Sequence, residues 1–209
     1  MSKTILFDID GTLIDTEKTI IKSWQKTLKD LLNLEPPAED LFYVLGIPGA
    51  KAVEKYSNSP QQSQLLLKTW EKNDHQMFHY SKLFTGIESM LQQLKDNNIT
   101  LGIVTSRTNE ELQLVLNKFA IKQYFDTFIT ASKTKLHKPN PEPILKAIDT
   151  LKIDPAETLY IGDSIYDFQC ARNAYVEFAL ASWGAKDNPE FAKVDYFLQK
   201  PADLLKLLN

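Results

Sequence analysis

The chain has 209 residues, of which 43% are hydrophobic and 24% charged, with a net charge of −3 at pH 7. This length suits one substantial domain with an elaboration, or two small domains. Lysine and arginine are scattered among acidic residues and form no basic stripe, which argues against a nucleic-acid partner. Cys170 is the only cysteine and cannot form an intrachain disulfide, and no stretch resembles a signal peptide or a membrane span. We therefore expect a soluble, cytoplasmic protein with no membrane partner.

The first strand ends in two carboxylates. Residues 4–13 read TILFDIDGTL, in which Asp8 and Asp10 follow an apolar run. Strand residues two positions apart point to the same face, and Gly11 allows the chain to turn. The segment is thus either a solvated surface turn or a carboxylate pair that a cation and an anionic substrate make tolerable. Residues further along the chain must decide between these two interpretations.

A helical region follows the first strand. The apolar spacing predicts helices over residues 15–34, 38–45, from about 50 to 57, and 61–80, separated by proline and glycine turns. The expected core face of the last helix consists of Leu65, Leu66, Trp70, Met77 and Phe78. We interpret Trp24, Trp70 and Trp183 as packing residues.

From residue 83 onward, predicted helices alternate with short β-branched strands. The strands are predicted over residues 99–104, 125–131, 158–161 and 176–181, with a weaker edge strand over 195–198. The helices are predicted over residues 86–97, 109–119, 144–151 and 202–208, and a further helix is predicted from just after Ser164 to about residue 174. This alternation predicts an α/β fold with a Rossmann-like parallel sheet core and an inserted all-helical domain. Residues 1–15 and 81–209 are assigned to the core, and residues 16–80 to the insertion.

Polar residues follow several of the predicted strands, and one loop adds a cation. They are Asp8, Asp10, Thr105, Ser106, Asp163 and Asp167, together with Lys138. Ligands of open parallel sheets bind beyond the carboxyl ends of the strands. A nucleophilic aspartate, a metal, hydrogen-bond donors and a lysine are the groups required for phosphoryl transfer to a carboxylate.

Simpler explanations exist for each of these residues alone. Thr105 could be a helix N-cap, and Lys138 a solvated loop lysine. Asp163 and Asp167 could be acids that the helix dipole favours. The combination of all these residues favours the phosphoryl-transfer interpretation.

Four motifs in order resemble those of the haloacid dehalogenase superfamily of phosphohydrolases. The first is FDIDGTL at residues 7–13 followed by Asp15-Thr16, and the second is IVTS at residues 103–106. The third is Lys138-Pro139 with Pro141, and the fourth is IGDSIYD at residues 161–167. The resemblance extends from residue 4 to residue 185, and the helical insertion resembles the first cap class of that superfamily.

The resemblance implies roles for the four aspartates. Asp8 would be the nucleophile that forms an aspartyl-phosphate, and Asp10 the general acid and base, whose backbone carbonyl also binds Mg²⁺. Asp8 and Asp163 would be carboxylate ligands of Mg²⁺. Asp167 would hold a metal-bound water.

The resemblance also implies a phosphate-binding set. The Thr105 hydroxyl, the Ser106 amide and the Lys138 ammonium would bind the phosphoryl oxygens, and Lys138 would also steady Asp8.

These roles predict a Mg²⁺-dependent phosphatase for a small phosphorylated metabolite, phosphoglycolate-like or a sugar phosphate. Asp10 argues against dehalogenases and phosphonate hydrolases, which lack this aspartate. Gly162-Asp163-Ser164 is nearer to phosphoglycolate phosphatase and pyrophosphatase relatives than to β-phosphoglucomutases, which typically have Glu-Asp-Ser and an earlier histidine. A phosphosugar mutase and a non-catalytic phosphate-binding regulatory protein stay as alternatives. Tyr175 departs from the glycine usual at that helix end.

A few residues have weaker interpretations. His75 and His79 could pair on a metal but are interpreted as surface residues, and His137 is left unassigned. Residues 46–51 are the expected substrate-facing loop. The pattern says nothing about oligomeric state.

Overall fold

The structure of the chain, a computed structural model, describes residues 4–45 and 47–208. Gly46 of the expected substrate-facing loop lies outside the described residues. The chain divides into two compact units, one from Asp15 to Lys82 and the other made of the chain before and after it. A buried apolar cluster lies in each unit.

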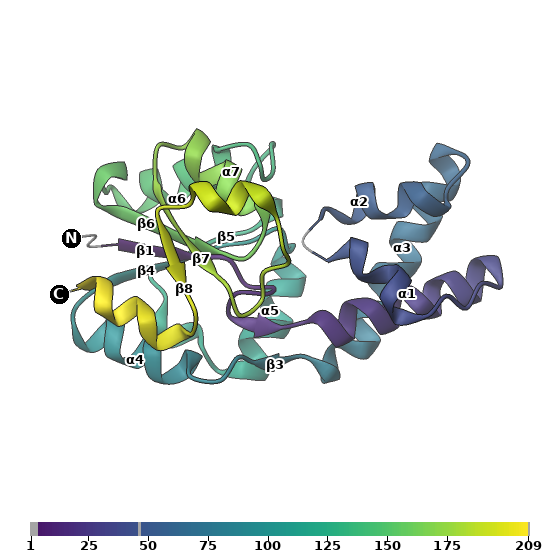
Figure 1. The fold of residues 1–209 in the computed structure, drawn as a ribbon, viewed down its shortest axis with the longest axis horizontal. Coiled ribbons are helices and arrows are strands. Elements are labelled where there is room, and N and C mark those ends of the chain that lie inside the picture. The colour runs from purple at the N-terminus through teal and green to yellow at the C-terminus, as the bar shows by residue number, and fades with distance from the viewer. Residues whose placement is uncertain (1–3, 46, 209) are drawn as a thin grey trace. The chain divides into compact units, whose positions relative to one another are not determined.

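The larger unit contains a six-stranded sheet in the order β5-β4-β1-β6-β7-β8, with every neighbouring pair parallel (Figure 1). Its strands are β1 (Thr4–Phe7), β4 (Thr100–Val104), β5 (Thr127–Ile129), β6 (Thr158–Gly162), β7 (Glu177–Ala181) and β8 (Tyr196–Leu198). The predicted α/β fold with a parallel sheet is confirmed. A second sheet pairs the two-residue strands β2 (Ile14–Asp15) and β3 (Lys82–Leu83), which are too short to show a sequence pattern.

Helices cover both faces of the large sheet. They are α4 (Ile87–Asp96), α5 (Asn109–Phe119), α6 (Glu142–Leu151) and α7 (Ile165–Asn173), with 3₁₀ turns η4 (Lys122–Tyr124), η5 (Ala131–Lys133), η6 (Pro155–Glu157), η7 (Pro189–Lys193) and η8 (Pro201–Leu208). Leu6 packs with residues of α6 and α7, whereas Ile5 and Phe7 point to the opposite face because strand side chains alternate. Figure 1 shows α6 and α7 on one side and α4 on the other.

Several elements differ from the predicted ones in extent or in type, and two examples lie in the larger unit. The strand expected over residues 125–131 is shortened to β5, because η4 and η5 flank it. The closing helix expected over residues 202–208 is the 3₁₀ segment η8. By contrast, α5 begins and ends where predicted, and a capping box between Thr108 and Glu111 sets its start.

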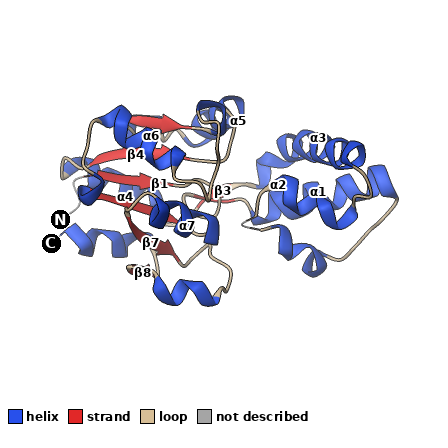
Figure 2. Ribbon diagram, turned by 90° about the horizontal axis from the view of Figure 1, so that it is seen from above, coloured by secondary structure: helices blue, strands red, loops and turns tan. Residues whose placement is uncertain are grey.

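The smaller unit is built from helices, in which α1 (Glu17–Leu32) packs against α3 (Pro60–Met77) (Figure 2). Its shorter elements are η1 (Ala38–Val44), α2 (Gly49–Ala52), η2 (Val53–Tyr56) and η3 (Phe78–Tyr80). Trp24 and Trp70 are buried with ring centroids 4.7 Å apart, which confirms that they are packing residues. Leu65 was expected in the core but is 54% exposed, because the buried stripe of α3 runs through Leu66 and Trp70.

Within residues 4–45 and 47–208, no helix combines the length and apolarity needed to cross a membrane.

Tyr175 stands where the family that the sequence resembles usually has glycine. It follows α7 and has φ of 57°. This left-handed conformation favours glycine, since a Cβ there crowds the backbone. The Tyr175 side chain is 90% exposed and therefore gains little from burial.

Replacing Tyr175 by glycine should stabilise the protein by about 0.5–1 kcal/mol, because the strain at positive φ is relieved. Urea denaturation measures the free energy of unfolding. Ala174, the preceding residue, has φ of −88°, so Ala174→Gly should destabilise by a similar amount. Equal effects of the two substitutions would contradict the interpretation.

Candidate active site

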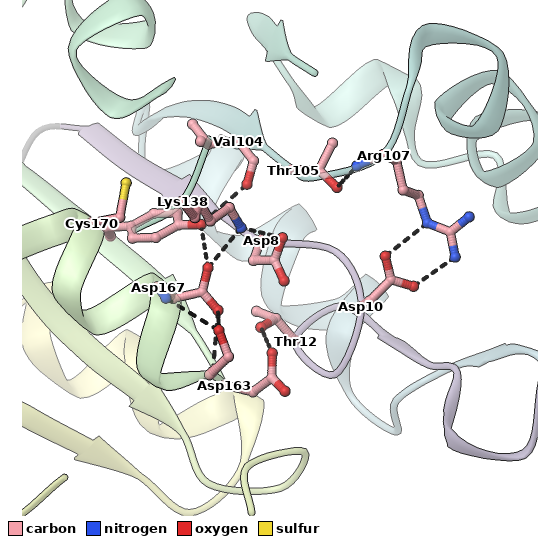
Figure 3. A network of polar contacts seen from close by, with 12 residues as sticks. Asp8, Asp10, Thr12, Val104, Thr105, Arg107, Lys138, Asp163, Asp167 and Cys170 are labelled. Atoms are coloured by element: carbon pink, nitrogen blue, oxygen red, sulfur yellow. Dashed lines mark hydrogen bonds and ion pairs between the residues drawn. The ribbon is translucent and has the colours of Figure 1, made fainter. Parts of the chain in front are cut away.

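The candidate site lies at the carboxyl ends of β1, β4 and β6. The chain runs outward from β1 to β4 and β5 and then returns to β6 on the other side of β1, which makes this edge a topological switch point. Asp8, Thr105 and Asp163 are each the first residue after their strand. The Asp8 amide still donates to the Ile161 carbonyl, at 2.9 Å, which holds its backbone beside β6. Figure 3 shows the resulting cluster of polar side chains.

Lys138 bridges two of the aspartates. Its Nζ lies 2.7 Å from Asp8 Oδ1 and 2.7 Å from Asp167 Oδ1, and its side chain is only 6% exposed. The solvated-loop explanation for Lys138 is therefore wrong. Burial by itself lowers the pKa of this ammonium, but Asp167 and Asp8 raise it, and the pKa lies above its ordinary value. Lys138 is thus a fixed positive charge against Asp8.

Both oxygens of Asp167 are held in place. The Tyr160 hydroxyl lies 2.8 Å from Asp167 Oδ1 and 3.1 Å from the Val104 carbonyl oxygen. Asp167 Oδ2 accepts hydrogen bonds from the amide and the hydroxyl of Ser164, as part of the capping box that begins α7. Sequence reasoning missed Tyr160, although a tyrosine in a buried strand needs a polar partner for its hydroxyl. These contacts make Asp167 a rigid support for Lys138.

Asp163 is positioned by the turn that follows β1. Thr12 Oγ1 donates to Asp163 Oδ1 at 3.1 Å. Gly11 has φ of 77°, and a Cβ at this position would lie 2.1 Å from Asp163 Oδ2. Glycine is therefore required at residue 11 both by the backbone conformation and by the approach of the Asp163 carboxylate.

Asp8, Asp163 and Asp167 form an acidic triad, with one oxygen of each within 4.8 Å of the others. Burial raises the pKa of Asp8 to about 7, with Lys138 opposing the rise and Asp167 and Asp10 adding to it. Burial, Asp167 and Asp8 also raise the pKa of Asp163 well above its ordinary value.

The triad fits a hard divalent cation. One lysine cannot balance three carboxylates, and an oxygen-only donor set is the kind that Mg²⁺ prefers. Among the described residues, it is the only group of three or more acidic, histidine or cysteine side chains with this geometry. The predicted ligation by the Asp10 backbone carbonyl stays a prediction.

The Asp10 side chain points to Arg107, from the loop after β4 (Figure 3). Arg107 Nε donates to Asp10 Oδ2 at 2.8 Å, and Arg107 Nη2 donates to Asp10 Oδ1 at 2.7 Å. Asp10 is 29% exposed and Arg107 only 9%. Sequence reasoning did not single out Arg107. The only available signal was its place beside Thr105 and Ser106 at a strand end.

Thr105 and Ser106 lie at the end of β4. Thr105 is buried, and its Oγ1 accepts a hydrogen bond from the Arg107 amide at 3.2 Å, a bond that does not use the hydroxyl hydrogen. The N-cap of α5 is Thr108, so the N-cap explanation for Thr105 is wrong. Ser106 is exposed, and its amide has no acceptor in the described part of the chain.

In the described part of the chain, none of the remaining residues that the sequence raised is hydrogen-bonded to the acidic triad. His75, His79 and His137 are exposed. Trp183 is half-buried, and its Nε1 donates to the Thr12 carbonyl at 2.9 Å, which links the segment after β7 to the turn after β1. Cys170 is buried in α7, and its thiol lies 3.0 Å from the Asn140 carbonyl oxygen.

Some known proteins match this chain over nearly its whole length. Pyrophosphatase PpaX of Bacillus mycoides is 31% identical, over 99% of this chain and 96% of the relative. A Clostridium perfringens protein, provisionally assigned as pyrophosphatase PpaX, is 34% identical over 100% of this chain and 98% of the relative.

A crystal structure of a provisionally assigned phosphoglycolate phosphatase from Lactobacillus plantarum is also similar. It superposes with a TM-score of 0.90 at 28% identity, over 99% of both chains. The family model of haloacid dehalogenase-like hydrolases matches residues 5–181, which include the whole acidic triad, Lys138 and Arg107. The chain belongs to the haloacid dehalogenase-like hydrolase family and is a hydrolase that acts on phosphate esters.

Proposed function

We propose that the protein is a Mg²⁺-dependent phosphatase that hydrolyses a small phosphorylated metabolite through an aspartyl-phosphate on Asp8. The observation that carries this proposal is the setting of the Asp8 carboxylate. Its Oδ1 is bonded to Lys138, and no described residue donates a hydrogen bond to its Oδ2. A buried carboxylate with one oxygen oriented and the other open is suited to nucleophilic attack.

In the first half-reaction, an Asp8 oxygen attacks phosphorus and the bond from phosphorus to the leaving oxygen breaks. Asp10 gives a proton to that oxygen, which departs as an alcohol or as the equivalent acid. In the second half-reaction, Asp10 accepts a proton from water while the water oxygen attacks phosphorus. The acyl-phosphate bond breaks, inorganic phosphate leaves, and Asp8 is restored.

The phosphoryl group would be held by donors from two segments. The Thr105 hydroxyl, the Ser106 amide and the Lys138 ammonium would bind its oxygens. Mg²⁺, held by Asp8 and Asp163 with Asp167 nearby, would neutralise negative charge on the phosphoryl oxygens. The contact of Lys138 with Asp8, at 2.7 Å, would also orient the Asp8 carboxylate for attack.

We also propose that the helical unit acts as a cap that selects the substrate, with residues 47–51 among its substrate-facing positions. The names of the relatives make phosphoglycolate and inorganic pyrophosphate the first compounds to assay. A phosphosugar mutase would instead convert one sugar phosphate to another. Product analysis for released inorganic phosphate separates these two activities.

Asp8→Asn should abolish phosphate release, with a loss of roughly 10⁴-fold or more, because an amide is not a competent nucleophile. Acid-stable labelling of the protein by a ³²P-labelled substrate measures formation of the aspartyl-phosphate. Release of inorganic phosphate measures the complete reaction. Asp149→Asn, an exposed position on α6, is the matched control and should keep full activity. An active Asp8→Asn protein would place the nucleophile elsewhere.

Mg²⁺ should stabilise the protein more at higher pH. The metal-free fold favours protonated Asp8, whose pKa is raised from 3.8 to about 7. The stabilisation from this group is therefore complete below about pH 4 and is lost as pH rises to about 7. Mg²⁺ binds the ionised carboxylates, so its affinity rises over the same range.

Thermal unfolding with and without Mg²⁺ measures this effect. Near pH 8, a hundredfold excess over the dissociation constant should raise the unfolding temperature by about 5–10 °C, and near pH 5 the shift should be close to zero. EDTA should abolish activity, and added Mg²⁺ should restore it. A shift that is independent of pH, or full activity in EDTA, would contradict the metal site.

Gly11→Ala should lower activity by about 100-fold, because the new methyl group displaces the Asp163 carboxylate. Gly86→Ala is the matched control. Gly86 also has positive φ, at 91°, but the nearest atom to a Cβ there is Pro201 Cβ at 3.9 Å. Both variants should lose about 1 kcal/mol of stability, and only Gly11→Ala should lose Mg²⁺-dependent phosphate release. Equal losses of activity would show that backbone strain alone is responsible.

A further inference from the structure

The pair between Arg107 and Asp10 occupies both oxygens of the proposed acid and base. The two hydrogen bonds, at 2.8 and 2.7 Å, form a fork in which the guanidinium faces the carboxylate edge. While this fork is closed, one acceptor site of each Asp10 oxygen is used by Arg107, and the carboxylate is held in one orientation. Releasing at least one of these hydrogen bonds frees that oxygen to turn toward a reacting ester.

Opening the fork leaves a buried cation without its carboxylate. The Arg107 side chain is only 9% exposed, so solvent replaces the lost contact poorly. An anion that takes the place of Asp10 removes this obstacle. The guanidinium fork fits carboxylate and phosphate groups equally well, because both present two oxygens at the required spacing.

The position of Arg107 determines which part of the substrate can supply that anion. In the proposed function, Asp10 acts on the oxygen of the leaving portion, so the group attached to that oxygen lies beside Asp10 and its partner. The phosphoryl group itself is held on the other side by Lys138 and Thr105.

We propose that Arg107 is a specificity-determining and positioning residue that exchanges Asp10 for an anionic group on the leaving portion of the substrate. This inference rests on the proposed function and deepens it. The exchange frees Asp10 for the reacting oxygen only when the leaving portion carries a carboxylate or phosphate. A phosphate ester with a neutral leaving portion leaves the fork closed and reacts slowly.

A purely structural role makes a different prediction. The Arg107 backbone already braces its loop, since its amide donates to Thr105 Oγ1 and its carbonyl accepts from the Ala131 amide. If the side chain only stiffens this loop or Asp10, its loss lowers the rate for every phosphate ester by the same factor.

The experiment compares two substrates that differ only in the leaving portion. Phosphoglycolate ends in a carboxylate and 2-hydroxyethyl phosphate in a neutral hydroxymethyl group. We expect kcat/KM of the unmodified protein with saturating Mg²⁺ to be at least about 30-fold higher for phosphoglycolate, which corresponds to one charge-assisted contact. In Arg107→Met this ratio should fall to within about threefold of one, and Arg107→Lys should keep part of it. Arg172→Met removes an exposed arginine from α7 and should keep the full ratio.

A binding measurement covers the case in which Arg107→Met is inactive. Calorimetry compares the non-hydrolysable pair 3-phosphonopropionate and 3-hydroxypropylphosphonate on the Mg²⁺-loaded protein, after circular dichroism has shown that each variant is folded. Preference for the carboxylate should be present in the unmodified protein and lost in Arg107→Met. If Arg107→Met does not fold, Arg107→Lys is measured in its place and should lose part of the preference.

The outcomes separate this inference from the proposed function. Hydrolysis by the unmodified protein with the same ratio in every variant overturns the inference and leaves the phosphatase intact. The absence of any preference in the unmodified protein, by rate and by binding, also overturns it. Failure of the unmodified protein to release phosphate from any ester overturns the proposed function instead.

Discussion

The site depends on the placement of three carboxylates around a single buried ammonium. Lys138 contacts Asp8 and Asp167 at equal distances, while Asp163 approaches from the end of β6. Like charges in such proximity are tolerated only if protons, a cation or hydrogen-bond donors compensate them. Burial first, and the neighbouring carboxylates after it, raise the pKa values of Asp8 and Asp163, and Lys138 only partly opposes this rise. The remaining repulsion makes the cluster receptive to a divalent cation.

The backbone around the triad is built for close approach. Gly11 leaves room for the Asp163 carboxylate, and Gly162 leaves room for Asp167, whose Cβ would lie 2.5 Å from a Cβ at residue 162. Tyr160 lies in β6 just before this glycine, and its hydroxyl contacts Asp167 Oδ1. The carboxylates are therefore held in place by strand ends and tight turns. A flexible loop would not hold them as firmly.

Two aspartates two residues apart have different surroundings. Asp8 is buried and bonded to a lysine, whereas Asp10 is partly exposed and paired with an arginine. These differences are consistent with the roles proposed above, in which Asp8 is the nucleophile and Asp10 is the acid and base that exchanges its partner. The lysine ammonium is a point charge that suits a permanent contact with Asp8. The planar arginine guanidinium suits a partner such as Asp10 that a carboxylate or phosphate could replace.

Much of the architecture could be predicted from the sequence, because apolar periodicity and turn residues are local signals. The alternation of helices and strands after residue 83 and the carboxylates at strand ends are examples, and α5 matched its predicted bounds. Element ends that depend on packing could not be predicted in this way. Leu65 is exposed because the partner of α3 decides which stripe is buried, and η8 is a 3₁₀ segment.

The sequence was sufficient to identify the residues at the ends of the strands, and hence to predict that Asp8, Thr105 and Asp163 share one edge. It also supplied Lys138 and Asp167 as candidates, through motif order. The hydrogen-bond partners become visible in the folded chain, where Lys138 lies between two aspartates, Tyr160 contacts Asp167, and Arg107 contacts Asp10. These contacts join residues up to 130 positions apart. Side-chain contacts of that kind arise from strand order and burial, which local patterns do not encode.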